Sequence, residues 1–343
     1  MTRNQPSEYR YPDPAPTVTV IVPVYDAEPY LGECLDSIAG QTFSDFEVIM
    51  INDGSTDGSR SICERFASSD PRFQLLNLPN GGVSAARNAG IDRARGRYIC
   101  FVDADDTIHP NYISRLTASM ADNDADVVIA RYAYGDSPSA LCDRQTEPLL
   151  FDPVNITELG LYQKICVNAA GGTMISRHII ENGLRYNTGR RYEDLDIFYK
   201  FLLRARKVAY IPDRLYFYRH NDSSFLNTFS EGRLDALEVT DDIVDYMRSH
   251  APQLVRAARD RRFSAHFNVL LLLLKYDADR PATVSRCMSV IKAERLNELL
   301  NPKVKLKNKL GALASYGGPG FLTFLNRLTG ACSRFKNILT RRS

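Results

Sequence analysis

Apolar residues in the first 135 positions alternate between continuous runs and helical spacing. The runs are short, mostly apolar and rich in β-branched residues, which predicts strands buried on both faces. The expected strands are residues 17–25, 46–53, 73–78, 97–106 and 125–132. Segments with helical character separate these runs. The expected helices are residues 27–41, 57–68, 82–94 and 110–121.

Strands that alternate with helices of about a dozen residues indicate β-α-β units. They predict an α/β fold with a mostly parallel sheet and helices on both faces. Ligands of such sheets bind at the carboxyl ends of the strands. Polar residues follow three of the expected strands at that end: Tyr25 with Asp26, Asp53, and Asp103 with Asp105. We therefore expect these side chains to face one crevice.

The pattern changes beyond residue 135. Residues 171–183 predict a short strand and a helix, and residues 190–225 predict a helix, two strands and a loop. From about residue 230 the apolar spacing is helical almost to the end of the chain. Residues 1–16 are polar and rich in proline, which predicts a disordered leader.

Composition narrows the function classes. The 343 residues carry a net charge of only +2, and we find no motif of a nucleic-acid-binding module, so no nucleic acid is expected as a partner. The seven cysteines include no C-x-x-C pair, which argues against a zinc site and favours a reducing compartment. The N-terminus lacks the apolar region of a signal peptide, and the run at 269–274 is too short to span a bilayer. We therefore expect a cytoplasmic protein.

The first expected strand–helix turn, VPVYDAEPYLGE, lacks the glycines of a dinucleotide site. Such glycines let the backbone approach a pyrophosphate, so their absence argues against Rossmann-type nicotinamide or flavin binding. The P-loop pattern G-x-x-x-x-G-K-[ST] is also absent from the sequence.

Three carboxylates, Asp103, Asp105 and Asp106, follow the fourth expected strand within four positions. Like charges this close raise one another's pKa, so a positive partner is expected. Carboxylate oxygens suit Mg²⁺ or Mn²⁺, which are usually completed by waters and substrate phosphates. The alternative is a polar turn in which Asp106 or Thr107 caps a helix.

Residues 17–135 carry four blocks that together resemble the family-two glycosyltransferases of the GT-A fold. The blocks are IVPVYDAEPY, INDGSTDGS, NGGVSAARN and FVDADD, in the order and spacing of that family. The resemblance implies a nucleoside diphosphate sugar as donor, usually UDP-linked, and a divalent metal. The positions that it assigns to the nucleotide sugar are Pro23, Tyr25, Glu28, Asp53, Gly81, Arg87, Asp103, Ala104 and Asp105.

The resemblance also implies individual roles. Asp53 would accept a hydrogen bond from the uracil ring, and Gly81 would let the loop pass close to the nucleotide. Arg87 would approach the phosphates, Asp103 would touch the ribose or metal, and Asp105 would be the main metal ligand. The alternatives are a capping role for Asp53 and a plain surface position for Arg87.

The acceptor side of the resemblance rests on YEDLDIF and YRHNDSSF. Family members with a matching Glu-Asp pair use the aspartate as general base, which implies that role for Asp194, beside Glu193. The alternative is that both acids only favour a helix N-terminus. His220 would ligate the metal; the alternative is a solvent-facing side chain, because relatives often carry this histidine one position later.

The last segment, residues 303–343, holds nine Lys or Arg and no Asp or Glu. Apolar and basic residues between 321 and 339 follow near-helical spacing, which predicts an interfacial helix on an anionic membrane surface, at the inner face of the cell membrane. The alternative is a helix packed on its own domain or on a second subunit of a homo-oligomer.

Taken together, the sequence predicts an inverting, metal-dependent transfer of one sugar to a saccharide or lipid-linked saccharide, and the resemblance places it in capsule, exopolysaccharide or surface-glycan synthesis. The chain has no tryptophan, so it lacks the Q-x-x-R-W motif of processive synthases. Its absence favours a non-processive enzyme. The expected domains are residues 17–229, with a nucleotide-sugar half to 135 and an acceptor half from 136, and a helical region at 230–343. The alternatives are a nucleotidyltransferase and an inactive nucleotide-sugar-binding module.

Overall fold

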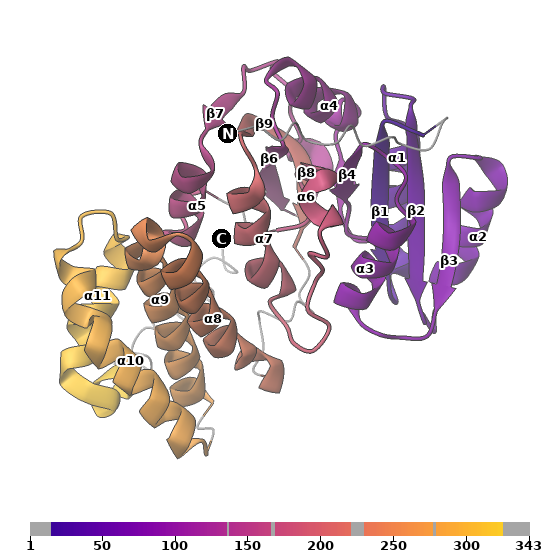
Figure 1. The fold of residues 1–343 in the computed structure, drawn as a ribbon. Helices are drawn as coiled ribbons and strands as arrows, with labels where there is room; N and C mark the ends of the chain where they lie inside the picture. Colours follow the sequence, from indigo (N-terminus) through magenta and orange to yellow (C-terminus); the bar gives the residue numbers. More distant parts are fainter. Residues whose placement is uncertain (1–14, 136, 166–168, 221–229, 277–278, 325–343) are drawn as a thin grey trace, which may run out of the picture. The chain divides into compact units, whose positions relative to one another are not determined.

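The computed structural model describes residues 15–135, 137–165, 169–220, 230–276 and 279–324 (Figure 1). The chain divides into two compact units. The first unit takes in the chain to Ile156, with Cys166–Gly189 and Glu193–His220; the second takes in Thr157–Ile165, Arg190–Tyr192 and everything from Asn221.

One sheet runs through the first unit. Its strands are β1 (Val18–Val24), β2 (Phe46–Asp53), β3 (Phe73–Leu78), β4 (Tyr98–Phe101), β5 (Thr107–Ile108), β6 (Val127–Gly135), β7 (Leu149–Phe151), β8 (Thr173–Ser176) and β9 (Val208–Arg219). The strand order is β3-β2-β1-β4-β8-β6-β9-β5, and β7 pairs with β9. The long ladders, within β3-β2-β1-β4 and between β6 and β9, are parallel. The antiparallel ladders of β8, β5 and β7 are short, so the predicted mostly parallel α/β architecture is confirmed.

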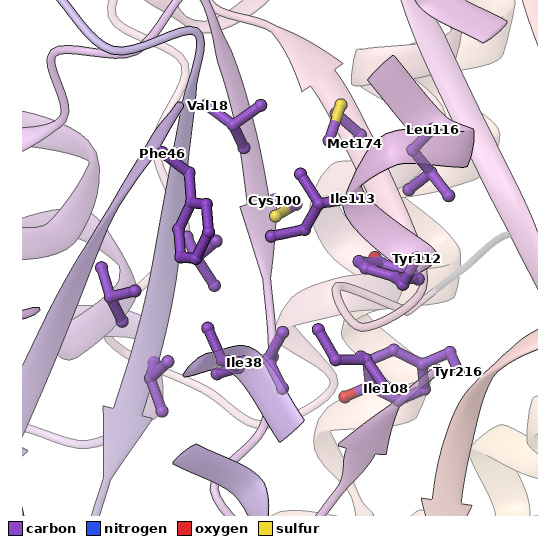
Figure 2. Packing of buried hydrophobic residues seen from close by; sticks show 14 of the residues in the cluster. Val18, Ile38, Phe46, Cys100, Ile108, Tyr112, Ile113, Leu116, Met174 and Tyr216 are labelled. Atoms are coloured by element: carbon purple, nitrogen blue, oxygen red, sulfur yellow. The ribbon is translucent and has the colours of Figure 1, made fainter. Parts of the chain in front are cut away.

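Helices cover both faces of this sheet (Figure 1). Those of the first unit are α1 (Glu28–Ala39), α2 (Ser59–Ser69), α3 (Val83–Arg93), α4 (Tyr112–Asp122), α6 (His178–Glu181) and α7 (Glu193–Arg204). Helix α1 buries Leu31, Leu35 and Ile38 in one core with alternate β1 residues, because spacing of three or four aligns them on one helix face. Figure 2 shows the same core continuing over Cys100 to Tyr112 of α4 and Tyr216 of β9.

Helix α3 lies against the other face of β1 and β2. A Cβ at Gly90 would come within 2.5 Å of Ile21 and 3.1 Å of Ile51, so glycine permits the close approach of this helix to the sheet. The tight packing places the N-terminus of α3, and with it Arg87, at the carboxyl ends of the strands.

The two strands expected after α7 are one strand. β9 continues through Pro212 and Asp213, and its register against β6 shifts from Ala130–Ile211 to Arg131–Arg214. A bulge of this kind takes up extra residues without ending the strand, so β9 continues past Pro212.

The second unit is helical. Its elements include part of α5 (Pro153–Leu161), then α8 (Asp235–His250), α9 (Val255–Lys275), α10 (Pro281–Leu300) and α11 (Leu306–Ala314). Phe263, Leu270 and Ile291 belong to its buried core. Within the described ranges, no helix has the length and apolar character needed to cross a membrane. Most of the expected leader, residues 1–14, and much of the expected tail helix, residues 325–343, lie outside the described residues.

Candidate active site

Asp53, the last residue of β2, organises the turn before α3. Its carboxylate is buried, and its two oxygens accept hydrogen bonds from the backbone N–H groups of Gly81 and Gly82, both at 2.8 Å. Gly82 has a φ of +84°, a conformation that favours glycine. Asp53 thus fixes the turn that leads into α3, but the N-cap of α3, Gly82, makes no side-chain capping bond. A carboxylate has about four acceptor sites, so the two bonds to Gly81 and Gly82 leave Asp53 able to accept another. The predicted contact of Asp53 with a nucleotide base stays a prediction.

The turn after β1 is braced in the same way against the turn after β2. Glu28 accepts the N–H of Gly58 at 2.8 Å, and Asp26 accepts the N–H of Thr56 at 2.7 Å. In return, Asp57 accepts the N–H of Glu28 at 2.9 Å. These reciprocal bonds fix the floor of the predicted nucleotide pocket. The pairing of Asp26 with Thr56 had no signal in the sequence, because nothing local relates the two turns.

Pro23 and Tyr25 belong to the same edge. Pro23 is buried within β1, whereas the ring of Tyr25, just beyond the strand, is 52% exposed. A flat exposed ring at the carboxyl end of a central strand suits contact with a planar base. The nucleotide roles predicted for these two residues stay predictions.

Arg87 is the centre of the charged site. Its side chain is 3% exposed, so it is not the plain surface arginine considered above. Its guanidinium donates to Asp103 at 2.9 Å and to both Glu193 and Asp194 at 3.0 Å. Burial opposes the charge of Arg87, but Asp194 and Asp103 outweigh burial and hold the pKa of Arg87 well above its usual value. One cation thus joins α3, the end of β4 and the start of α7.

Asp194 is held from two sides. One carboxylate oxygen accepts from Arg87, and the other accepts the backbone N–H of Ala170 at 3.0 Å. Burial, with smaller effects from Glu193 and Asp103, raises the pKa of Asp194 to about 7 although Arg87 lowers it. Because α7 begins at Glu193, both acids also lie at the positive end of the helix dipole.

The acidic turn after β4 has three different environments. Asp106 is buried, accepts from the Tyr216 hydroxyl at 2.7 Å and from the Arg219 N–H at 2.9 Å, and burial raises its pKa to about 8. Asp103 is bound by Arg87. The pKa of Asp105 is raised, first by burial and then by Asp103. An added positive charge near Asp105 would therefore favour its ionised form.

Arg219 supports this turn from β9. Its Nε donates to the Asp105 carbonyl at 2.8 Å, its Nη2 pairs with Glu33 at 2.6 Å, and its guanidinium lies over the Tyr30 ring. These bonds fix the backbone of the turn, including the buried Ala104. The charge of Arg219 also lowers the pKa of Asp105, which offsets part of the rise caused by burial and by Asp103.

A divalent cation fits this donor set in part. Among the described residues, no group of three or more His, Cys, Asp or Glu side chains is arranged to hold a metal ion. Asp103 and Asp105 offer two carboxylates, which matches the way Mg²⁺ is held when phosphates and waters supply the other ligands. His220 is exposed and its backbone N–H donates to the Gly135 carbonyl at 3.0 Å, so its metal role stays a prediction.

With this geometry established, comparison with known proteins is informative. Residues 19–184 match the model of glycosyl transferase family 2. The glycosyltransferase GlyG of Streptococcus pneumoniae is 34% identical over 223 residues, which cover 62% of this chain and 73% of GlyG. This chain belongs to glycosyl transferase family 2. It is therefore a glycosyltransferase, as the sequence motifs had predicted.

Other similarities set the scope of this assignment. GlyA of S. pneumoniae is 36% identical over 64% of this glycosyltransferase, but the match spans only 33% of GlyA. The structure of Staphylococcus aureus TarS 1–349 in complex with UDP-GlcNAc has a TM-score of 0.70 and 20% identity, and covers 91% of this chain and 90% of that chain. At this identity the likeness shows the fold, which supports the predicted GT-A architecture.

The Arg87 cluster predicts a pH-dependent loss of stability. Replacing Arg87 with Met leaves Asp103, Glu193 and Asp194 without their shared cation, which should lower the free energy of unfolding by about 3 kcal/mol near pH 7.5. The pKa of Asp194 is already raised in the folded state, so the folded protein binds a proton that the unfolded chain has released. Folding stability associated with this carboxyl therefore falls as pH rises from about 4 towards about 7.

Urea unfolding of both proteins near pH 7.5 and near pH 5.5 measures this effect, and the deficit of Arg87→Met should shrink at the lower pH. Arg60→Met is the matched control, because Arg60 pairs with Glu64 on an exposed face and its loss should change stability by less than about 0.5 kcal/mol. A deficit that is equal in the two variants, or constant with pH, would contradict the role of Arg87.

Proposed function

We propose that this glycosyltransferase transfers one sugar, with inversion, from a UDP-linked sugar to a saccharide or lipid-linked saccharide in cell-surface polysaccharide synthesis. The observation that carries the proposal is the convergence on Arg87 of Asp103 and Asp194. Asp103 follows β4 in the motif that the family uses for the donor, and Asp194 lies in the first turn of the helix predicted to serve the acceptor. Both carboxylates accept hydrogen bonds from one guanidinium. The residues proposed for the donor and for the acceptor therefore lie next to each other.

The donor side rests on the braced turns after β1, β2 and β3. Asp53 and Glu28 hold backbone N–H groups at 2.8 Å, which fixes the turns before any ligand binds. A pocket fixed in advance loses less conformational entropy on binding. The TarS structure of the same fold contains UDP-GlcNAc, which supports a UDP-linked donor here.

Asp194 is the proposed general base. A base whose pKa is near the working pH is most effective, and the pKa of Asp194 is about 7. As the acceptor oxygen forms its bond to the anomeric carbon, Asp194 takes the hydroxyl proton, and the bond to the nucleoside diphosphate breaks with its electron pair leaving on the phosphate oxygen. The Ala170 N–H holds one oxygen of Asp194, which orients the carboxylate for this transfer.

Asp103 and Asp105 are the residues proposed to hold Mg²⁺ or Mn²⁺. A bound divalent cation supplies neutralising charge for the departing diphosphate. The raised pKa of Asp105 supports the assignment, because an added positive charge would relieve the repulsion from Asp103.

An inactive nucleotide-sugar-binding module is the alternative to catalysis. Such a module has no need for a buried base, yet Asp194 lies in a built environment with Arg87 and Ala170 as partners. A nucleotidyltransferase would need a Gly-rich, Lys-containing first turn, which VPVYDAEPY does not provide. The cytoplasm is the proposed compartment, and the described cysteines, all free thiols, are compatible with it.

The second unit presents an apolar stripe that we propose as a site for an anionic membrane surface. Leu306, Leu310 and Leu313 of α11 are 71%, 58% and 60% exposed and follow helical spacing. The inner side of the same helix is fixed, since the Asn308 amide donates to Asp260 at 3.0 Å. Residues 303–343 carry nine basic and no acidic side chains, which favours anionic lipid over a neutral protein surface.

The donor assignment predicts a metal-dependent response to UDP. UDP at about one hundred times its Kd should stabilise the protein by about 2.7 kcal/mol. The measurement is thermal shift and UDP release with UDP, GDP and CMP sugars, each with Mn²⁺ and with a chelator. Asp105→Ala should remove the dependence on Mn²⁺. No response to any nucleotide would contradict the proposed function.

Asp194→Asn should reduce kcat by at least about 100-fold while UDP binding is retained. Asparagine can still accept the Ala170 N–H with its one oxygen, although it loses the bond to Arg87, and it cannot take a proton. Retained UDP binding therefore also shows that the site remains folded. Steady-state transfer rates and calorimetry with UDP measure the two effects, with Asp245→Asn on the exposed face of α8 as control. Near-normal turnover of Asp194→Asn would exclude this residue as the base.

The membrane proposal predicts that replacing Leu306, Leu310 and Leu313 with Ser reduces sedimentation with phosphatidylglycerol-containing vesicles. The matched control replaces Leu149 and Leu150, two half-exposed residues of β7, with Ser. Phosphatidylcholine vesicles should bind neither protein. Equal sedimentation of the two variants would contradict the proposal, and loss of a dimer instead would assign the stripe to a second copy.

A further inference from the structure

Strands β6 and β9 both end in a Tyr-x-Tyr sequence, and Tyr216 alone of these four tyrosines appears in the site described above. The sequence is RYAYG in β6 and LYFYR in β9. The two strands are parallel neighbours, and their register pairs Tyr132 with Tyr216 and Tyr134 with Tyr218. Alternate residues of a strand share one face, so the four rings lie on the same face at the carboxyl ends of both strands.

The inner pair of rings is buried, and the Tyr216 hydroxyl is bonded to the acidic turn after β4. Tyr132 and Tyr216 are in edge-to-face contact, with ring centroids 5.2 Å apart. The Tyr216 hydroxyl donates to Asp106 at 2.7 Å and accepts the Asp103 N–H at 3.1 Å. The inner pair therefore supports the acidic turn after β4 directly.

The same pair lies against the segment that holds Asp194. The Tyr132 hydroxyl donates to the Gly171 carbonyl, and Gly171 follows Ala170, whose N–H binds Asp194. A Cβ at Gly171 would lie 2.4 Å from the Tyr216 ring, so only glycine lets the chain pass over that ring. The inner tyrosines thus contact the acidic turn after β4 and the segment whose Ala170 holds Asp194.

The outer pair is exposed. Tyr134 is 62% exposed and Tyr218 is 40% exposed, with ring centroids 5.9 Å apart. Tyr134 stacks on the buried Tyr132, with the two ring planes 24° apart, which holds it in place. Paired, supported rings that face solvent next to a catalytic centre are a feature of binding sites.

We propose that Tyr134 and Tyr218 form the acceptor subsite, where a pyranose ring of the acceptor saccharide stacks on them. A pyranose has a face made of C–H groups, which matches the electron-rich face of an aromatic ring, and the phenol hydroxyls suit its hydroxyl edge. The inference rests on the proposed function, since it assumes that Asp194 activates an acceptor hydroxyl.

Strand order separates this subsite from the donor pocket. Tyr25, Asp53 and Gly81, assigned to the nucleotide, lie at the carboxyl ends of β1, β2 and β3, whereas the tyrosines end β6 and β9, beyond β4 and β8 in the sheet. The acidic turn of β4 lies between the two groups. The sugar to be transferred would thus meet an acceptor that arrives from the β6–β9 side.

The test uses the full chain, the donor selected by UDP release, and p-nitrophenyl glycosides of glucose, galactose and N-acetylglucosamine as acceptors. Tyr134→Ala and Tyr218→Ala should each raise the acceptor KM about fivefold to tenfold. UDP binding and UDP release without acceptor should not change. Tyr134→Phe should keep most of the wild-type KM, because its ring still stacks, and Tyr276→Ala, a partly exposed tyrosine of the other unit, is the control.

The outcomes separate the two hypotheses. If the wild-type protein releases no UDP from any donor, the proposed function fails. If it does, an unchanged acceptor KM in both alanine variants overturns the subsite. An equal loss of UDP binding and acceptor affinity also overturns it, because the tyrosines would then act through the general structure of the site. Wild-type UDP release without transfer to any of the glycosides would count against a pyranose platform as well.

Discussion

A single buried guanidinium holds the catalytic region of this protein together. Arg87 donates to three carboxylates, two of which lie more than one hundred positions away in the sequence. Arginine suits this position because its planar head offers several donors in a fixed arrangement and stays charged when buried. Without that charge, Asp103, Glu193 and Asp194 would repel one another in a partly dehydrated site. The position of α7 relative to the sheet therefore depends on an ion cluster as much as on apolar packing.

Carboxylates elsewhere at the strand ends serve a different purpose. Asp53, Glu28 and Asp26 accept backbone N–H groups of neighbouring turns, so their charges organise loops before any ligand is present. Such charge-assisted hydrogen bonds are stronger than bonds between neutral groups. They hold the turns around the predicted pocket in one conformation. Asp105 is the contrasting case, because its pKa is raised by burial and by Asp103. Asp105 is the residue of the acidic turn after β4 that we propose as the main metal ligand.

The second half of the sheet contributes aromatic rather than charged groups. The Tyr216 ring packs in the core, as Figure 2 shows, while its hydroxyl binds Asp106. The Tyr132 hydroxyl binds the carbonyl of Gly171, the residue after Ala170. From these buried rings the stack continues outwards to Tyr134 and Tyr218. Tyrosine suits all these positions because its large ring packs against apolar neighbours while its hydroxyl forms hydrogen bonds.

Most strands and helices up to residue 135 were predicted from the sequence, because β-branched apolar runs and helical spacing are local signals that depend on burial. The end of β4 at Phe101, four residues after its predicted start, and the short strand β5 were not predicted. The sequence motifs also identified the family and the acidic turn at Asp103. Tertiary structure decided what each of these residues contacts. The bulge that carries β9 past Pro212, the bond from Ala170 to Asp194, the burial of Arg87 and the alignment of the two Tyr-x-Tyr pairs all join distant segments. The reason is physical: periodicity records which faces are buried, whereas hydrogen bonds and ion pairs between distant residues depend on distances that only the folded chain sets.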